Sequence, residues 1–121
     1  MANTYKGEYI SMEDNKDILC SASYYKHGYF LNDKFNRLPE NIKRELRVIT
    51  VCLAERTKGI AIIGFYKESA DVYIEVMNQP DDYLYDEISA KLEVGYVERD
   101  NEELFNSLSL WYKTFIKGAL K

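Results

Sequence analysis

The chain is poor in the residue types that most often carry chemistry. It has one histidine, two cysteines, two prolines and six glycines among 121 residues. Cys20 and Cys52 lie far apart, with no CxxC pair and no cysteine–histidine cluster, which argues against a zinc site or a thioredoxin-type motif. GxGxxG, GK[ST] and GxSxG sequences are also missing, so neither a dinucleotide turn, a P-loop nor a nucleophile elbow is indicated. We therefore predict no cofactor and no metal.

Long apolar runs are missing too. No stretch approaches the roughly 20 apolar residues of a membrane-spanning helix. The first residues, MANTYKGEYISMEDNKD, lack the apolar core of a secretory signal. We expect a cytoplasmic protein with reduced thiols and no membrane partner.

Basic charge is scarce in the second half of the chain. The net charge is −4; the chain through Gly59 carries ten lysines and arginines against eight acids, whereas the remainder carries six against twelve. Such a field repels a phosphate backbone, so we predict no nucleic-acid partner. The basic set Lys43, Arg44 and Arg47 is too small to reverse this and is expected to be the solvated face of one helix.

The segment YYKHGYF at residues 24–30 is typical of a β-hairpin turn. We predict a loop at residues 26–28 in which Tyr25 pairs with Tyr29. Gly28 is expected to take the positive φ that a hairpin loop demands, because glycine does so without steric cost.

His27 lies in that loop, seven residues after Cys20. A strand rises about 3.3 Å per residue, so the two side chains would be far beyond the contact of about 3 Å that a nucleophile and its base need. A pair with Cys52 is left open by this argument. We expect His27 to be an exposed turn residue, distant from any thiol or carboxylate with which it could work.

The clearest helix spans residues 38–59. Pro39 fits its first turn and Gly59 the position just after its end. Its core face is an apolar stripe at helical spacing: Ile42, Leu46, Ile49 and Leu53. Three further residues widen the stripe and predict deep burial of the second half: Val48, Val51 and Cys52.

Further strand and helix patterns follow in the chain after Gly59. Residues 60–77 predict a second hairpin, apolar on both faces first and alternating afterwards. Leu84, Ile88 and Leu92 predict a short helix that ends near Gly95. A last helix follows, capped by Asp100, with a stripe that packs across a sheet or is partly shared with a second subunit: Leu104, Leu108, Trp111 and Phe115.

These elements predict an α+β domain in the order ββαββαα, an antiparallel sheet of two hairpins with three helices packed on one face. Residues 1–16 are expected to be a polar N-terminal tail and residues 17–121 a single domain.

Tyrosine is abundant, with eleven in the chain. Tyrosine suits strands and the rim of a core, and it also suits self-association surfaces. We predict five aromatic residues as possible interface residues of a homodimer: Tyr24, Tyr29, Tyr73, Trp111 and Tyr112. An alternative use of Tyr24, Tyr25, Tyr29 and Phe30 is a stacking platform for single-stranded RNA, which lacks the basic rim that it would need.

The acidic stretch around residues 81–87 admits two interpretations. Asp82 and Asp86 are four residues apart and could hold a hard cation, but acids at a helix start also favour its dipole. The spacing of an EF-hand is missing. No catalytic, cofactor-binding or metal site is therefore predicted.

Two stretches resemble a known family: YYKHGYFLNDKFNRLPENIKRELRVITVCLAE and YDEISAKLEVGYVERDNEELFNSLSLWYKTFIKG. The resemblance is to short uncharacterised proteins of clostridia and related Gram-positive anaerobes, a domain of unknown function, and it spans roughly Cys20 to Gly118. It implies a small cytoplasmic bacterial protein and brings no activity or functional residue.

The function expected from the sequence is a non-enzymatic interaction or regulatory module acting as a homodimer. The alternative is a small-ligand-binding protein or enzyme whose site is assembled from scattered residues, with four candidates: His27, Cys52, Tyr85 and Asp86.

Overall fold

The computed structural model describes residues 15–118. The four strands are β1 (Lys16–Ser23), β2 (Gly28–Leu31), β3 (Ile60–Tyr66) and β4 (Val72–Met77). The three α-helices are α2 (Glu40–Thr57), α3 (Glu87–Asp100) and α4 (Glu102–Trp111). A 3-10 turn, η1 (Asp33–Phe35), precedes α2, and a π-helical turn, η2 (Tyr112–Lys117), continues α4.

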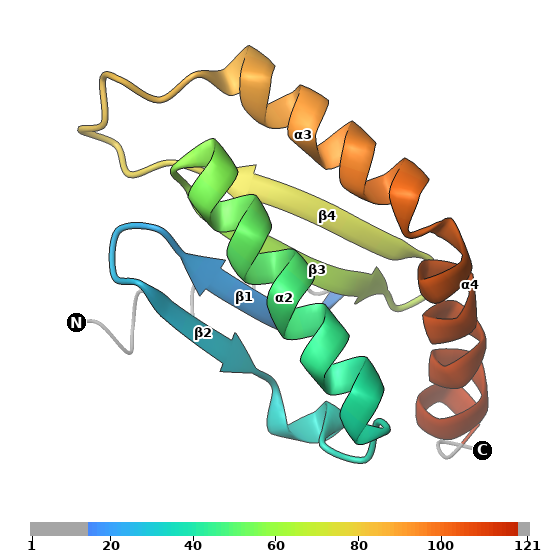
Figure 1. Cartoon of the computed structure of the whole chain (residues 1–121). Helices are drawn as coiled ribbons and strands as arrows, with labels where there is room; N and C mark the ends of the chain where they lie inside the picture. The colour runs from blue at the N-terminus through green and yellow to red at the C-terminus, as the bar shows by residue number, and fades with distance from the viewer. Residues whose placement is uncertain (1–14, 119–121) are drawn as a thin grey trace.

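The strands form one antiparallel sheet in the order β2-β1-β3-β4. Helices α2 and α3 lie antiparallel to each other over one face of this sheet, and α4 closes the end of the same layer (Figure 1). The predicted α+β class and order of elements are confirmed. Of the predicted tail, residues 1–14 lie outside the described residues, while Lys16 already belongs to β1.

The first hairpin differs from its prediction in register. Ser23 pairs with Gly28 and Ala22 with Tyr29, so the connection spans residues 24–27 and the predicted pairing of Tyr25 with Tyr29 is wrong. His27, rather than Gly28, takes the positive φ, at 52°. A histidine tolerates this left-handed conformation in a turn better than a β-branched residue does.

Helix α2 confirms the core stripe and corrects its width. Leu46 and Leu53 are buried, and Ile42 and Ile49 pack against the core from half-buried positions. Val48 and Cys52, expected to be buried, are exposed on the side of α2 that faces the hollow beside α3. The helix ends at Thr57, and its C-cap residue Lys58, which precedes Gly59, takes the left-handed conformation (φ 56°). Gly59 instead lies so close to the Met77 backbone that a Cβ would meet its carbonyl oxygen at 2.7 Å.

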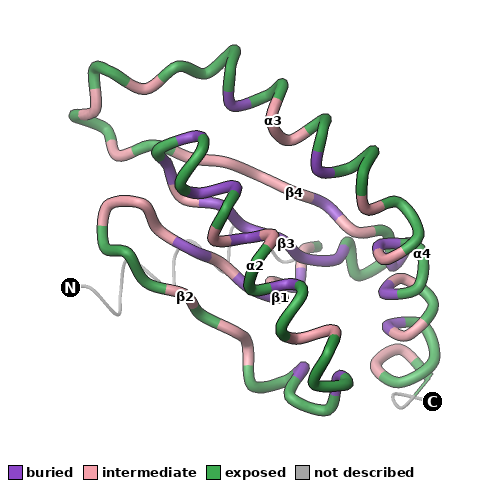
Figure 2. Tube along the Cα trace, in the orientation of Figure 1, coloured by how far each residue is buried: buried purple, intermediate pink, exposed green. Residues whose placement is uncertain are grey.

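Helix α3 is shifted relative to the prediction: it begins at Glu87, so Leu84 lies in the turn before it, and it runs through Gly95 to Asp100. Its buried residues are Ala90 and Val97. Leu84, Ile88 and Leu92, the apolar residues that predicted the helix, have exposed fractions of 95%, 75% and 55%. An apolar stripe on a surface helix usually faces the core. In α3 the stripe faces away from the core, and Figure 2 shows the helix largely exposed.

Helix α4 packs through Phe105 and Leu108, which are buried, while Phe115 at the far end of the predicted stripe is exposed. The predicted cap is wrong, since Asp100 is the last residue of α3 and Asn101 precedes α4 with no side-chain cap. Tyr112 then stacks on Phe65 of β3, with ring centroids 4.3 Å apart. This contact ties the C-terminal turn to the centre of the sheet.

Candidate functional site

His27 lies in the exposed turn that the sequence predicts, but it has a carboxylate within reach. Its Nδ1 atom is 3.5 Å from Oε2 of Glu55 on α2, so the expectation of an isolated ring is wrong. Both side chains are largely exposed, at 71% and 49%. A contact between two such exposed polar groups is screened by water and contributes little. This contact joins the hairpin turn to α2 at the exposed surface.

The other scattered candidates lie in different places. Cys52 lines a hollow of about 190 Å³ between α2 and α3, which also includes Val48 and Tyr96. Tyr85 lines a separate hollow between β4 and α3. Asp86 caps α3, and the hydrogen bonds that it accepts from the backbone N–H and hydroxyl of Ser89 lower the pKa of its carboxyl. The fold therefore does not gather these side chains into one site.

Cys20 belongs to a buried polar cluster between β1 and α2. Its Sγ is 3.3 Å from Oγ1 of Thr50, whose hydroxyl also donates to the carbonyl of Leu46. Burial raises the pKa of the Cys20 thiol to about 11. Because the thiolate is the reactive form, a buried thiol that stays protonated is a poor nucleophile.

Tyr29 closes this cluster from β2. Its hydroxyl is buried and has no hydrogen-bond partner within residues 15–118. Burial, and then the neighbouring Cys20, raise the pKa of Tyr29. The guanidinium of Arg47 lies 5.6 Å from the ring centroid, a cation–π contact that covers the tyrosine from the solvent side.

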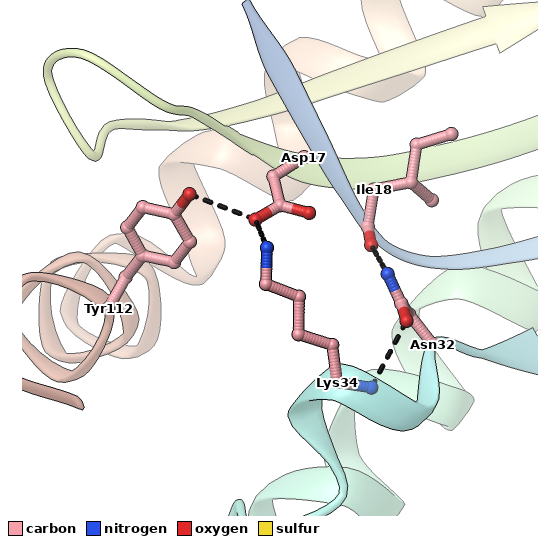
Figure 3. Close-up of polar contacts among 5 residues, drawn as sticks. All are labelled: Asp17, Ile18, Asn32, Lys34 and Tyr112. Atoms are coloured by element: carbon pink, nitrogen blue, oxygen red, sulfur yellow. Dashed lines mark hydrogen bonds and ion pairs between the residues drawn. The ribbon is translucent and has the colours of Figure 1, made fainter. Parts of the chain in front are cut away.

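A second buried cluster centres on Asp17 (Figure 3). Its Oδ2 atom accepts hydrogen bonds from Lys34 Nζ at 2.7 Å and from the Tyr112 hydroxyl at 2.9 Å. Burial, and then the bond to Asp17, raise the pKa of Tyr112. Beside it the Asn32 side chain donates to the Ile18 carbonyl and accepts from the Lys34 backbone N–H. The cluster joins β1, η1 and η2, so it stabilises the docking of the C-terminal turn on the sheet. We call it the Asp17 lock.

This lock was invisible in the sequence. Asp17 and Tyr112 are 95 residues apart, and neither belongs to a motif of fixed spacing. Lys34 was equally unremarkable, as one of many lysines between predicted elements. Only the docking of the last helix on the sheet brings the three side chains together.

The acids at residues 81–87 form local contacts. Asp82 accepts a hydrogen bond of 2.6 Å from the Tyr25 hydroxyl, and burial followed by this bond raises the pKa of Tyr25. Asp86 is the cap of α3. Within the described part of the chain, no group of three or more potential ligand side chains could hold a metal ion. Nor does any helix there have the length and apolarity to cross a bilayer.

The five predicted interface aromatics occupy varied environments. Tyr112 and Tyr73 are buried within the chain, with exposed fractions of 2% and 5%. The remaining three are half-buried: Tyr24, Tyr29 and Trp111. Their role at an interface stays a prediction. Tyr29 packs against the core and its strand neighbour Phe30 is exposed, so successive residues point to opposite faces and do not form one stacking platform.

The outer surface of the two long helices carries several exposed apolar residues. We define the outer helical surface by six exposed residues: Val48 and Cys52 of α2, and Leu84, Ile88, Leu92 and Tyr96 of α3 or the turn before it. Arg56 and Glu93, 3.9 Å apart, span the two helices beside it. Rows of exposed apolar side chains, unlike single ones, mark interaction surfaces.

Comparison with known proteins identifies one family. Residues 16–120 match the model of a family of unknown function (DUF6145). The chain belongs to this family. The match covers the segment for which the sequence showed a resemblance, Cys20 to Gly118. No curated protein and no solved structure matches the chain.

Proposed function

We propose that this chain is a small non-enzymatic interaction module that binds another protein chain through the outer helical surface. The observation that carries the proposal is the direction of the α3 stripe. On α3 the apolar residues Ile88, Leu92 and Tyr96 recur every four residues and have exposed fractions of 75%, 55% and 44%. Leu84, in the turn before the helix, has an exposed fraction of 95%. A helix that lays such a row into a groove or against another helix is a recurrent mode of protein recognition.

The geometry of the reactive side chains supports the same proposal. His27, Cys52 and the adjacent pair Tyr85 and Asp86 lie in three separate places on the fold. The buried groups Cys20 and Asp17 are engaged in contacts that fix strands to helices. A reaction needs its groups within hydrogen-bond reach of one substrate, which this distribution does not provide.

Site-specific photocrosslinking in cells tests the proposal. A photoreactive amino acid at position 92 or 96 is expected to give a discrete adduct with another polypeptide chain, whereas the same amino acid at Lys113, exposed on η2, is expected to give none. Adducts of equal intensity from all three positions, or from none of them, would contradict a binding surface on α3.

A second candidate function is the binding of a small ligand in the hollow between β4 and α3. This hollow measures about 280 Å³ and includes Tyr85, Glu87 and Lys91 among its lining residues. Its volume lies at the lower end of ligand pockets. A thermal-shift screen of small metabolites checks this candidate. A ligand whose effect on Tm is lost in Tyr85→Ala would favour it over the interaction module.

The cellular setting is part of the proposal. Both cysteines are free thiols, one buried and one exposed, which fits a reducing compartment. We place the protein in the cytoplasm of a clostridial or related bacterium, as the family resemblance implies. Cell fractionation with an antibody to the chain checks this setting, and recovery of the protein in the medium would contradict it.

A further inference from the structure

The most exposed part of the outer helical surface is self-complementary. We call Ile88 and Leu92 of α3, together with Leu84 in the turn before the helix, the outer seam. Glu87 and Lys91 are exposed and lie one helical turn apart beside this seam, since both line the hollow on the β4 side of α3. The seam is therefore an apolar row flanked on one side by an acid near its start and a base near its end.

A two-fold axis through Ile88 matches this row to itself. In an antiparallel pair of α3 helices, Ile88 meets Ile88 of the second copy, and Leu92 lies towards the turn before α3 of the second copy, which carries Leu84. Lys91 of each copy then faces Glu87 of the other copy, so two opposite-charge pairs flank the apolar contact. In a parallel pair the two-fold axis would run along the helices and would place the two charged flanks on opposite sides of the contact, so Glu87 and Lys91 would not meet across it. Isologous dimers use one patch twice in this manner, and complementary charges fix its orientation.

We propose that the chain binds a second copy of itself through the outer seam, with the two α3 helices antiparallel and the two-fold axis beside Ile88. This inference rests on the proposed function, because it names the partner of the same surface. Antiparallel helices also place the positive end of each dipole beside the negative end of the other. Figure 1 shows that α3 lies at the margin of the molecule, so a second helix can approach it without meeting the sheet.

The size of the seam sets the strength of the dimer. Helix α3 has 14 residues and is about 21 Å long at a rise of 1.5 Å per residue. Tyr83 and Tyr96 extend the contact at its two ends. Such an interface is smaller than the standard one of about 800 Å² per partner, so the dimer is weak and dissociates on dilution.

Charge exchange tests the pairing. Glu87→Lys and Lys91→Glu each place two like-charge pairs across the interface and are expected to raise the dimer dissociation constant about tenfold or more. Mixing these two variants, or combining them in one chain, restores opposite-charge pairs and is expected to restore the dimer. Glu98→Lys is the matched control, because it makes the same charge change on α3 ten residues beyond Ile88. Analytical ultracentrifugation over a range of concentrations measures each constant.

Disulfide trapping tests the position of the axis. In a Cys52→Ser background, which removes the exposed thiol, Ile88→Cys is expected to form a disulfide-linked dimer under mild oxidation. Leu92→Cys is expected to react much more slowly, because its symmetry mate lies about 12 Å away along the helix pair. Leu110→Cys, exposed on α4, is the control for collisional oxidation.

Two results would overturn the inference in different ways. A chain that stays monomeric at all concentrations contradicts pairing with a second copy, while adducts with other proteins from positions 92 and 96 would still uphold the interaction module. A dimer that survives both single charge reversals, or that crosslinks at Leu110 as readily as at Ile88, contradicts the use of α3.

Discussion

Helices α2 and α3 lie side by side on the same sheet and carry similar apolar stripes, yet they use them in opposite directions. In α2, Leu46 and Leu53 point to the sheet and are buried. In α3 the seam points outward, and the small residue Ala90 together with Val97 makes the contact with the core. The difference teaches that amphipathic spacing locates a helix and an apolar face, while the neighbours decide what that face touches.

The largest expected difference in stability is between truncating the buried stripe of α2 and truncating the exposed stripe of α3. Leu46→Ala in α2 leaves a cavity under a fully buried side chain and is expected to lower the free energy of unfolding by about 2–5 kcal/mol. Ile88→Ala in α3, at a concentration where the chain is monomeric, is expected to change it by less than about 0.5 kcal/mol. Urea denaturation measures both. Equal losses would show that the α3 stripe belongs to the core.

Two glycines show the same contrast between packed and exposed positions, one in the sheet and one in helix α3. A Cβ at Gly64 of β3 would meet the Asp17 carbonyl oxygen at 2.6 Å and the Tyr73 ring at 2.7 Å. Gly64→Ala is therefore expected to destabilise the fold by about 1–3 kcal/mol through overpacking.

Gly95 in α3 has no heavy atom within 4 Å of such a Cβ. Gly95→Ala is expected to raise the free energy of unfolding by about 0.5–1 kcal/mol, because alanine is the better helix former. Thermal unfolding of the two variants shows opposite shifts in Tm if the assignment holds. A loss of stability in Gly95→Ala would place that side of α3 against another part of the chain.

The Asp17 lock fixes the C-terminal turn η2 to strand β1 of the sheet. Tyr112→Phe removes one donor to a buried carboxylate, and it is expected to cost about 1–3 kcal/mol because Asp17 loses a partner. Lys34→Met removes the other donor, whose side chain is 46% exposed, and water can replace it in part. The measured loss should be larger for Tyr112→Phe; the reverse order would assign the lock to the lysine.

The smallest effect is expected from the two cysteine thiols, which differ in exposure and therefore in reactivity. Cys52 is exposed and should react with a thiol reagent in the native protein, whereas Cys20 should react only on unfolding. Burial raises the pKa of Cys20 from 9.0 to about 11, so the folded state retains its proton where the unfolded state loses it. The contribution of the protonated thiol to stability is thus complete below pH 9 and is lost as pH rises from 9 towards 11.

The variant Cys20→Ala separates this contribution from that of the tyrosines. Tyr29 and Tyr112 also have raised pKa values, which begin to matter only above their ordinary value of 10.0. The stability of the variant should therefore stay level to a higher pH than that of the wild type. Identical alkaline profiles of the two proteins would contradict the raised pKa of Cys20.

Local sequence signals predicted most of the fold, because they depend on residues close together in the chain. The stripe of Ile42, Leu46, Ile49 and Leu53 located α2, and alternation located β4. The details that failed depend on backbone fit: the loop closed at residues 24–27, so the positive φ fell on His27 instead of Gly28. Which of two adjacent residues takes that conformation depends on the register of the strands that the turn joins.

The candidate surface was only half predictable. Spacing identified Leu84, Ile88 and Leu92 as one face, but no local rule says whether a short helix turns this face inward. In the structure the residues that α3 buries are Ala90, beside β4, and Val97, beside α2. In α2 the face that carries Leu46, Thr50 and Leu53 is buried, and Val48 and Cys52 lie outside it and are exposed.

Sedimentation of the wild-type protein beside Ile88→Glu, across a range of concentrations, tests most directly whether the outward stripe of α3 is a binding surface. The wild type is expected to pass from monomer to dimer as its concentration rises. Ile88→Glu is expected to remain monomeric, and Leu110→Glu, the same change on an exposed residue of α4, should behave as the wild type does. A wild-type chain that never exceeds the monomer mass, or a dimer that Ile88→Glu leaves intact, would contradict self-association through the outer seam.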